Sequence, residues 1–251
     1  MKFSEMLAPM SEVEFARRVM AGETFFIEGS ESKFEGLISL EEIEQRLNDG
    51  CNTAMPVHII RDGQRIPLLD EPVLWSGKAT RKREIGNLIA NGHSFMMTNM
   101  SQMNARVSSL MDSIEGFFEN AHADLHLYVS PGAGSTGYLA HRDRPQHKIY
   151  LQIIGSSTWW IYAHSASLPD DVGAVPIEQE NDLLRQKMHF KLTPGDLLYM
   201  PPNVFHKVRS EAGPRVSFSI PIIFLDRSAD TVRMDRTHIP LSDIMTRASG
   251  V

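Results

Sequence analysis

Apolar positions in the first 50 residues recur at the spacing of two amphipathic helices. Residues 11–21 (SEVEFARRVMA) and 39–49 (SLEEIEQRLND) each open with a serine that has a glutamate three positions later. That pattern predicts a capping box, in which the two side chains bond to each other's backbone N–H groups at the start of a helix. Gly22 and Gly50 follow the two segments, and each is expected to end its helix.

Two further helices and two short β elements are expected before residue 120. Residues 80–90 and 101–119 have helical spacing, and residues 24–29 (TFFIEG) predict a short strand. Residues 57–69 predict a small hairpin that turns at an Asp-Gly step. The helix at 101–119 is expected to face the core, because its apolar positions form one stripe: Val107, Leu110, Met111, Ile114, Phe117 and Phe118.

The period changes after residue 124, where short runs of branched and aromatic residues alternate with turn residues. This spacing is typical of an all-β sandwich or barrel. We therefore expect a single domain over residues 1–251, with a helix-rich part (1–120), a barrel core (121–225) and a C-terminal arm (226–251). The predicted strands are residues 125–129, 148–154, 158–162, 189–192, 196–200, 205–208 and 215–222.

Composition and charge narrow the class of protein. The 251 residues are 42% hydrophobic and 22% charged, with a net charge of -6, which is ordinary for a globular protein with a sizeable core. The largest basic cluster is residues 78–83 (KATRKR), so nucleic-acid binding is not expected. Cys51 is the single cysteine, which suits a reducing compartment. The N-terminus does not resemble a secretory signal and no apolar run approaches membrane-spanning length, so we expect a cytoplasmic protein without membrane contact.

Three residues carry the strongest chemical signal. His141 and Asp143 form an H-x-D step after a glycine-rich turn, and His206 lies on a later predicted strand. On extended backbone, residues i and i+2 point to the same face. Two imidazoles and one carboxylate can bind one face of a metal octahedron and leave the other positions open, as in non-haem Fe(II) sites that activate oxygen. We predict that these three residues bind one metal ion and form the catalytic centre.

The approach to His206 supports this reading. The segment follows a G-x5-P-x-N-x2-H pattern, from Gly195 through Pro201 and Asn203 to His206. Cupin barrels have a second glycine where Asn203 stands, and asparagine tolerates left-handed backbone nearly as well. The remaining histidines are expected to be structural or solvent-exposed, and His147 is the alternative ligand if one of the three is misassigned.

With these motifs, the chain resembles the JmjC and cupin-like Fe(II)/2-oxoglutarate oxygenases over residues 95–223. The resemblance implies a double-stranded β-helix, or jelly roll, with the N-terminal helices packed outside. It implies Fe(II), 2-oxoglutarate and O2 as cofactors and cosubstrates, and a hydroxylation or demethylation reaction. An aspartate ligand favours hydroxylation over halogenation. The segment LQIIGSSTWWIY matches the family pattern through Leu151, Gln152, Gly155, Trp159 and Tyr162.

One position departs from the family pattern. Ser157 stands where the family has a lysine that binds the far carboxylate of 2-oxoglutarate, and a serine supplies no positive charge. Arg215 is the expected replacement, because its R-x-S step lies nine residues after His206 and an arginine can bind a carboxylate with two parallel hydrogen bonds. Ser217 is expected to assist it. Alternatives are Lys148 and Lys207, and Tyr128 and Tyr138 are further candidate donors to the cosubstrate.

The sequence says least about the substrate. Because the chain is small and acidic and the long C-terminal dimerisation domain of ribosomal oxygenases looks absent, we expect a small molecule, such as an amino acid or a biosynthetic intermediate. Modification of a protein side chain is the alternative. Two other classes are a cupin metalloenzyme that does not use 2-oxoglutarate, and a scaffold protein. The first usually has H-x-H and a following glutamate, which residues 143–155 lack. A homodimer is left open.

Overall fold

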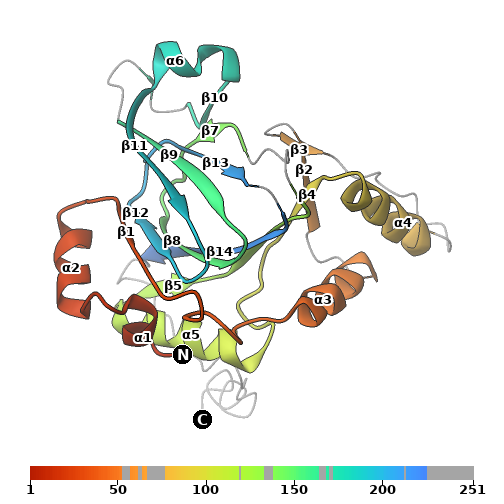
Figure 1. The fold of residues 1–251 in the computed structure, drawn as a ribbon, viewed down its shortest axis with the longest axis horizontal. Helices are drawn as coiled ribbons and strands as arrows, with labels where there is room; N and C mark the ends of the chain where they lie inside the picture. Colours follow the sequence, from red (N-terminus) through yellow and green to blue (C-terminus); the bar gives the residue numbers. More distant parts are fainter. Residues whose placement is uncertain are drawn as a thin grey trace, which may run out of the picture.

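Two antiparallel sheets face each other in this protein, and helices cover the outer side of the larger one (Figure 1). The computed structural model describes residues 1–52, 57–61, 64–66, 77–118, 120–132, 138–163, 168–169, 172–211 and 213–224. Its helices are α1 (Phe3–Leu7), α2 (Glu12–Met20), α3 (Leu40–Asn52), α4 (Gly77–Ala90), α5 (Ala105–Phe117), the 3-10 turn η1 (Ile177–Gln179) and α6 (Glu180–Leu183).

The strands of the described residues make a nine-stranded and a five-stranded sheet. The larger sheet has the order β1-β12-β8-β14-β6-β4-β2-β3, with β5 also paired to β14, and the smaller has the order β10-β7-β13-β9-β11. Their bounds are β1 (Phe25–Ile27), β2 (Val57–Arg61), β3 (Gln64–Ile66), β4 (Ser94–Met97), β5 (Ala121–Ala123), β6 (His126–Ser130), β7 (Ala140–His141), β8 (His147–Ile154), β9 (Ser157–Ala163), β10 (Ala174–Val175), β11 (Arg185–Leu192), β12 (Leu197–Met200), β13 (His206–Ser210) and β14 (Arg215–Phe224). The predicted jelly-roll class with flanking helices is confirmed.

Local sequence explains how the helices begin. The capping box at α3 is complete, because the backbone N–H of Ser39 donates to Glu42 and the N–H of Glu42 donates to the Ser39 hydroxyl. At α2 only half of it forms. Ser11 accepts from the N–H of Glu14, but the Glu14 carboxylate pairs with Arg17 and Arg18 one turn further along.

Some predicted boundaries were wrong. The helix expected to stop at Gly50 continues to Asn52. The helix expected over 101–119 is shorter, because Asn104 accepts a hydrogen bond from the N–H of Val107 and so begins α5 at Ala105. The 57–69 hairpin is confirmed by the antiparallel pairing of β2 with β3, and its turn lies outside the described residues.

Side chains of the larger sheet alternate between two environments. On β12, Leu197 and Tyr199 belong to the cluster that packs against α1, α2 and α5, whereas Leu198 and Met200 point between the sheets. On β8, Tyr150 likewise points between the sheets. This period of two separates a hydrophobic outer core from the space between the sheets, which holds a second apolar cluster together with buried polar side chains such as His206 and Arg215.

The part expected to be helix-rich also supplies strands. β1 pairs with β12, and β2 and β4 extend the larger sheet beyond β6. One buried cluster therefore includes residues from Phe3 to Ile222. The C-terminal arm predicted at residues 226–251 lies outside the described residues. Among those described, every helix is too short or too polar to cross a membrane.

Candidate active site

His141 and His206 lie directly opposite each other on neighbouring strands. His141 ends β7, His206 begins β13, and the two residues are partners in the antiparallel register. Their ring centroids are 4.3 Å apart. Asp143 follows two residues after His141, and the three side chains bring candidate ligand atoms within 4.8 Å of one another. The three residues that the sequence singled out thus converge.

Backbone carbonyl groups determine which ring nitrogen carries the hydrogen in both imidazoles. Nδ1 of His141 is 2.8 Å from the carbonyl oxygen of Leu139, and Nδ1 of His206 is 3.1 Å from that of Val204. A carbonyl can only accept, so each Nδ1 carries the hydrogen and each Nε2 keeps its lone pair. Such bonds to the far nitrogen are typical of histidines that bind metals, because they fix the ring orientation.

Asp143 is held by two side chains from β8. The Tyr150 hydroxyl donates to its Oδ2 atom across 3.3 Å, and Nζ of Lys148 is 3.7 Å from its Oδ1 atom. Oδ2 also lies 3.8 Å from Nε2 of His206. One carboxylate oxygen therefore faces the histidines, and the other faces a buried lysine.

Burial and charge set the protonation states of this cluster. Burial lowers the pKa of His206 to about 3 and also lowers the pKa of His141, so both rings are neutral at physiological pH. Burial alone would raise the pKa of Asp143, but Lys148, the two histidines and the Tyr150 hydroxyl together outweigh burial, and the pKa lies below its ordinary value. Two neutral imidazoles beside an ionised carboxylate form a donor set suited to a divalent cation.

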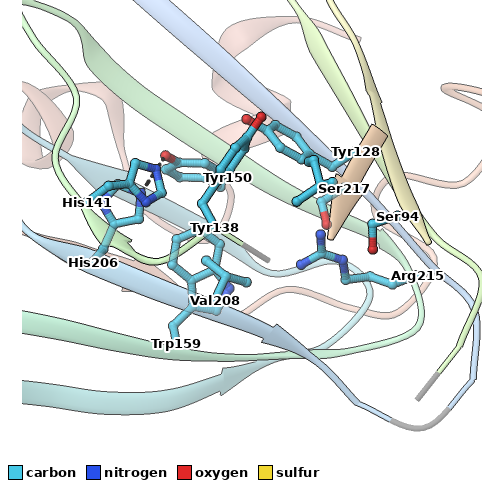
Figure 2. A pocket seen from close by; sticks show the side chains of 11 residues that line it. Ser94, Tyr128, Tyr138, His141, Tyr150, Trp159, His206, Val208, Arg215 and Ser217 are labelled. Atoms are coloured by element: carbon cyan, nitrogen blue, oxygen red, sulfur yellow. Dashed lines mark hydrogen bonds between the residues drawn. The ribbon is translucent and has the colours of Figure 1, made fainter. Parts of the chain in front are cut away.

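A pocket extends from the histidines into the space between the sheets. Figure 2 shows His141 and His206 at one end of it and Arg215 at the other. Trp159 stacks against His206, with ring planes 19° apart, and forms part of the wall. The lining residues are Ile60, Ser94, Tyr128, Tyr138, His141, Tyr150, Trp159, His206, Val208, Arg215 and Ser217.

Arg215 is a buried cation that has no carboxylate partner among the described residues. Only 6% of the surface of Arg215 is exposed to solvent. Its Nε–H group has no hydrogen-bond acceptor, and no carboxylate in the described part of the chain pairs with the guanidinium. Burial lowers the pKa of its guanidinium to about 10, which leaves it charged at neutral pH. A buried, unpaired charge is costly, so this geometry favours an anion that enters the pocket.

Hydroxyl groups surround this end of the pocket. Ser217 lies two residues along β14 and donates to Oε1 of Gln152 across 3.4 Å. Tyr128 is opposite Ser217 on β6, its ring is 6.5 Å from that of Tyr138, and burial raises its pKa, so it remains a donor. Four of the five residues expected to contact the cosubstrate thus line one pocket: Tyr128, Tyr138, Arg215 and Ser217.

Lys148 is the fifth, and it lies elsewhere. Its ammonium is beside Asp143 and its side chain is not part of the pocket lining. The other alternative, Lys207, forms an ion pair with Glu180, 2.6 Å away, on α6. His147 bonds through Nδ1 to the Tyr199 hydroxyl among the outer aromatic residues, so the structure does not bring it to the site.

Ser157 belongs to a buried network of hydrogen bonds. It is fully buried, its hydroxyl donates to Oε1 of Gln152, and it accepts from the indole N–H of Trp159. Trp159 and Trp160 face opposite sides of β9, since Trp159 stacks on His206 and Trp160 stacks on His189.

Sequence reasoning missed Tyr150 and Ser94. Tyr150 hydrogen bonds within the metal-binding cluster, and Ser94 lines the arginine end of the pocket. The alternation of β8 carries a signal for the first, since Lys148, Tyr150 and Gln152 share a face and all are polar. Ser94 comes from β4, whose place beside β6 is not evident from sequence.

Comparison with known proteins gives a consistent result. The family model described as "JmjC domain" matches residues 96–229. A bifunctional lysine-specific demethylase and histidyl-hydroxylase NO66 from Drosophila persimilis is 26% identical over 218 residues, which are 83% of this chain and 29% of that protein. Ribosomal oxygenase 2 from Mus musculus is 31% identical over 97 residues, or 39% of this chain and 20% of that protein.

Solved structures agree with this at the level of the fold. Escherichia coli ribosomal oxygenase YcfD has a TM-score of 0.56 at 14% identity, and the match covers 95% of this chain and 65% of the YcfD chain. A structure of YcfD in complex with cobalt and 2-oxoglutarate has a TM-score of 0.57 at 12% identity. The chain thus spans less than a third of the curated relatives and under two thirds of YcfD.

These relatives contradict one expectation from the sequence. A small-molecule substrate was expected from the modest size of the chain and its acidic charge. The matching proteins are instead named for histidyl hydroxylation, lysine demethylation or the ribosome. Size and net charge were poor guides, because neither depends on what enters the pocket. The small-molecule prediction was wrong.

Proposed function

This chain belongs to the JmjC domain family, and from that premise we propose that it is an Fe(II)- and 2-oxoglutarate-dependent oxygenase that hydroxylates a protein side chain. The observation that carries the proposal is the convergence of His141, Asp143 and His206 at one end of a pocket whose other end holds a buried arginine with no carboxylate partner in the described part of the chain. A metal site alone would be consistent with many cupins. The buried guanidinium of Arg215 additionally favours a cosubstrate that carries a negative charge.

Each protein group has a defined task in this proposal. His141, Asp143 and His206 hold the iron through Nε2, one carboxylate oxygen and Nε2. With 2-oxoglutarate and O2, the bound iron supplies the oxidising power that inserts an oxygen atom into a C–H bond. Arg215 binds the far carboxylate of 2-oxoglutarate, and Ser217 and Tyr128 donate hydrogen bonds at the same end. Tyr138 and Trp159 exclude water from the space between.

The substrate class is proposed from the relatives rather than from the pocket. Their names describe reactions on histidyl and lysyl residues of proteins or on the ribosome. The carboxylate ligand of Asp143 favours hydroxylation over halogenation, and demethylation of a lysyl side chain is the alternative reaction. Neither a homodimer nor a cytoplasmic location bears on this proposal, and both stay predictions.

Succinate production tests the proposal most directly. The purified chain is incubated with Fe(II), 2-oxoglutarate and air, with and without a ribosomal protein fraction, and succinate and protein mass are measured. We expect succinate formation that rises with the protein fraction, and a gain of one oxygen atom in a protein. His206→Ala should abolish both, whereas His189→Ala, on the outer face of β11, should not. A chain that binds neither metal nor 2-oxoglutarate would sink the proposal and favour a scaffold role.

A further inference from the structure

Tyr150 places its phenol oxygen inside the cluster of proposed metal ligands. The oxygen is 3.3 Å from Oδ2 of Asp143 and 3.3 Å from Nε2 of His206, and those two atoms are 3.8 Å apart. Figure 2 shows the ring beside the two histidines, with its hydrogen bond to His206 drawn as a dashed line. Nothing in the JmjC-like sequence pattern pointed to this residue.

The three distances define a small triangle. A circle through its corners has a radius of about 2 Å, which is the length of a bond from a divalent metal to nitrogen or oxygen in proteins. An ion bound to Asp143 and His206 at ordinary bond lengths can therefore approach the Tyr150 oxygen to about 2 Å, when it lies on the side of those two atoms that faces the phenol. Because Tyr150 is on β8, in the middle of the larger sheet, its position does not depend on a loop.

The hydrogen count supports a cation at this point. The His206 ring has its hydrogen on Nδ1, bonded to the carbonyl oxygen of Val204, so Nε2 offers only a lone pair. Asp143 offers only lone pairs too. The Tyr150 hydroxyl has one hydrogen for two acceptors, Oδ2 of Asp143 and Nε2 of His206, so when it donates to one of them its oxygen and the other acceptor face each other with lone pairs. A metal ion at this point would accept both lone pairs and so remove the repulsion.

We propose that Tyr150 is a fourth protein ligand of the resting metal site, bound through a lone pair of its phenol oxygen. This inference rests on the proposed function, since it needs a metal at His141, Asp143 and His206. Four protein ligands would leave room for two further donor atoms, such as those of the keto-acid end of 2-oxoglutarate. The phenol of Tyr150 would then occupy the place that O2 needs, so Tyr150 would limit oxygen binding in the resting protein.

Cobalt(II) alone, without cosubstrate, is the probe that tests this. The visible spectrum and the cobalt dissociation constant are compared for the unmodified chain, Tyr150→Phe and the control Tyr162→Phe. Tyr162 is a suitable control because its hydroxyl donates to Glu180 on α6 and its side chain is not part of the pocket lining. We expect Tyr150→Phe to change the spectrum and raise the dissociation constant roughly tenfold or more, and Tyr162→Phe to change neither.

The outcomes separate the two proposals. If the unmodified chain binds no cobalt, or if His206→Ala does not weaken binding, the proposed function fails. If binding is normal but Tyr150→Phe leaves the spectrum unchanged, Tyr150 is not a ligand, even where the dissociation constant rises. Should Tyr150→Phe fail to fold, water proton relaxation of the Mn(II)-loaded unmodified chain decides. Two bound waters support the inference, and three overturn it.

Discussion

Asn203 links Asp143 to the segment that leads into His206, and so connects two parts of the candidate metal site. Its backbone N–H donates to the carbonyl oxygen of Asp143 across 2.9 Å, three residues before His206 begins β13. Its side-chain oxygen also accepts from Nε of Arg144, next to Asp143. The residue has a φ of 70°, in the left-handed region. The asparagine that replaces a glycine of the cupin pattern thus keeps the backbone shape and adds a contact of its own.

Substitution of Asn203 should separate backbone shape from side-chain contact. Asn203→Gly keeps the left-handed conformation and should change the free energy of unfolding by less than about 1 kcal/mol. Asn203→Val forces a branched side chain into that conformation and should cost about 2 kcal/mol, with weaker cobalt binding because the link to Asp143 is strained. Urea unfolding and cobalt titration measure the two effects. Equal stability of the two variants would refute the backbone argument.

Gly29 and Gly195 cross so closely that neither tolerates a side chain. A Cβ atom on Gly195 would lie 1.9 Å from the carbonyl oxygen of Ser30, and one on Gly29 would lie 2.0 Å from that of Gly195. Asp196 adds to this crossing by accepting from the N–H of Gly29. This contact fixes the segment around Gly29 and Ser30, which precedes α3, against the turn that leads into β12.

Gly195→Ala should therefore destabilise the protein by about 3 kcal/mol, through the clash and through a φ of 93°. Gly22→Ala is the matched control, because Gly22 also has a positive φ, of 65°, but nothing lies within 4 Å of its added Cβ. We expect the control to lose about 1 kcal/mol. Thermal unfolding compares the two, and equal losses would mean that the close approach contributes nothing.

Lys33 gives stability a pH dependence above neutrality. Partial burial lowers the pKa of its ammonium to about 8, although Asp196 acts in the opposite direction, and its Nζ donates to the carbonyl oxygen of Ala8. The folded protein then binds fewer protons than the unfolded chain between about pH 8 and the ordinary lysine pKa near 10.4, so the contribution of Lys33 to stability rises with pH over this window.

Lys33→Met should remove that contribution. We expect the free energy of unfolding to rise less between pH 8 and pH 10 in the variant than in the unmodified chain, as measured by urea unfolding at several pH values. Lys187→Met, on exposed β11, should keep the original slope. An unchanged slope in Lys33→Met would show that burial does not perturb this ammonium.

Whether a structural feature could be predicted from the sequence depends on how far apart in the chain its interacting residues lie. The capping box of Ser39 and Glu42 and the left-handed Asn203 are local, so the sequence predicted them and the structure confirms them. The convergence of His141 and His206 was foreseen through a spacing pattern shared by related barrels. The pairing of β1 with β12 was not, because a three-residue strand carries no signal for a partner some 170 positions away.

The candidate site shows the same limit. That Arg215 could bind an anion was suggested by its R-x-S step, but its lack of a partner depends on which strands surround it. Lys148 was offered as an equivalent donor, and only the register of β8 shows that it faces Asp143 instead. Residue type and spacing thus suggest the donors. Which of them share a cavity is decided by pairings between distant strands.

Arg215 makes the sharpest prediction about the cosubstrate. Arg215→Met removes the buried cation while keeping much of the side-chain volume, so the far carboxylate of 2-oxoglutarate would enter a pocket without a counter-charge. Loss of one partner of a buried pair costs about 3 kcal/mol or more, which predicts a rise of roughly a hundredfold in the KM for 2-oxoglutarate. Cobalt affinity should not change, because the arginine lies at the far end of the pocket from the histidines.

A graded series makes this test specific. Arg215→Lys keeps the charge but loses the planar pair of donors, so its KM should fall between those of the unmodified chain and Arg215→Met. Arg209→Met is the control, since Arg209 lies over the ring of Trp160 on the outer side of β13. Succinate formation over a range of 2-oxoglutarate concentrations gives the KM values. If Arg215→Met and Arg209→Met behave alike, the cosubstrate is bound by other residues, and the unpaired guanidinium needs a different explanation.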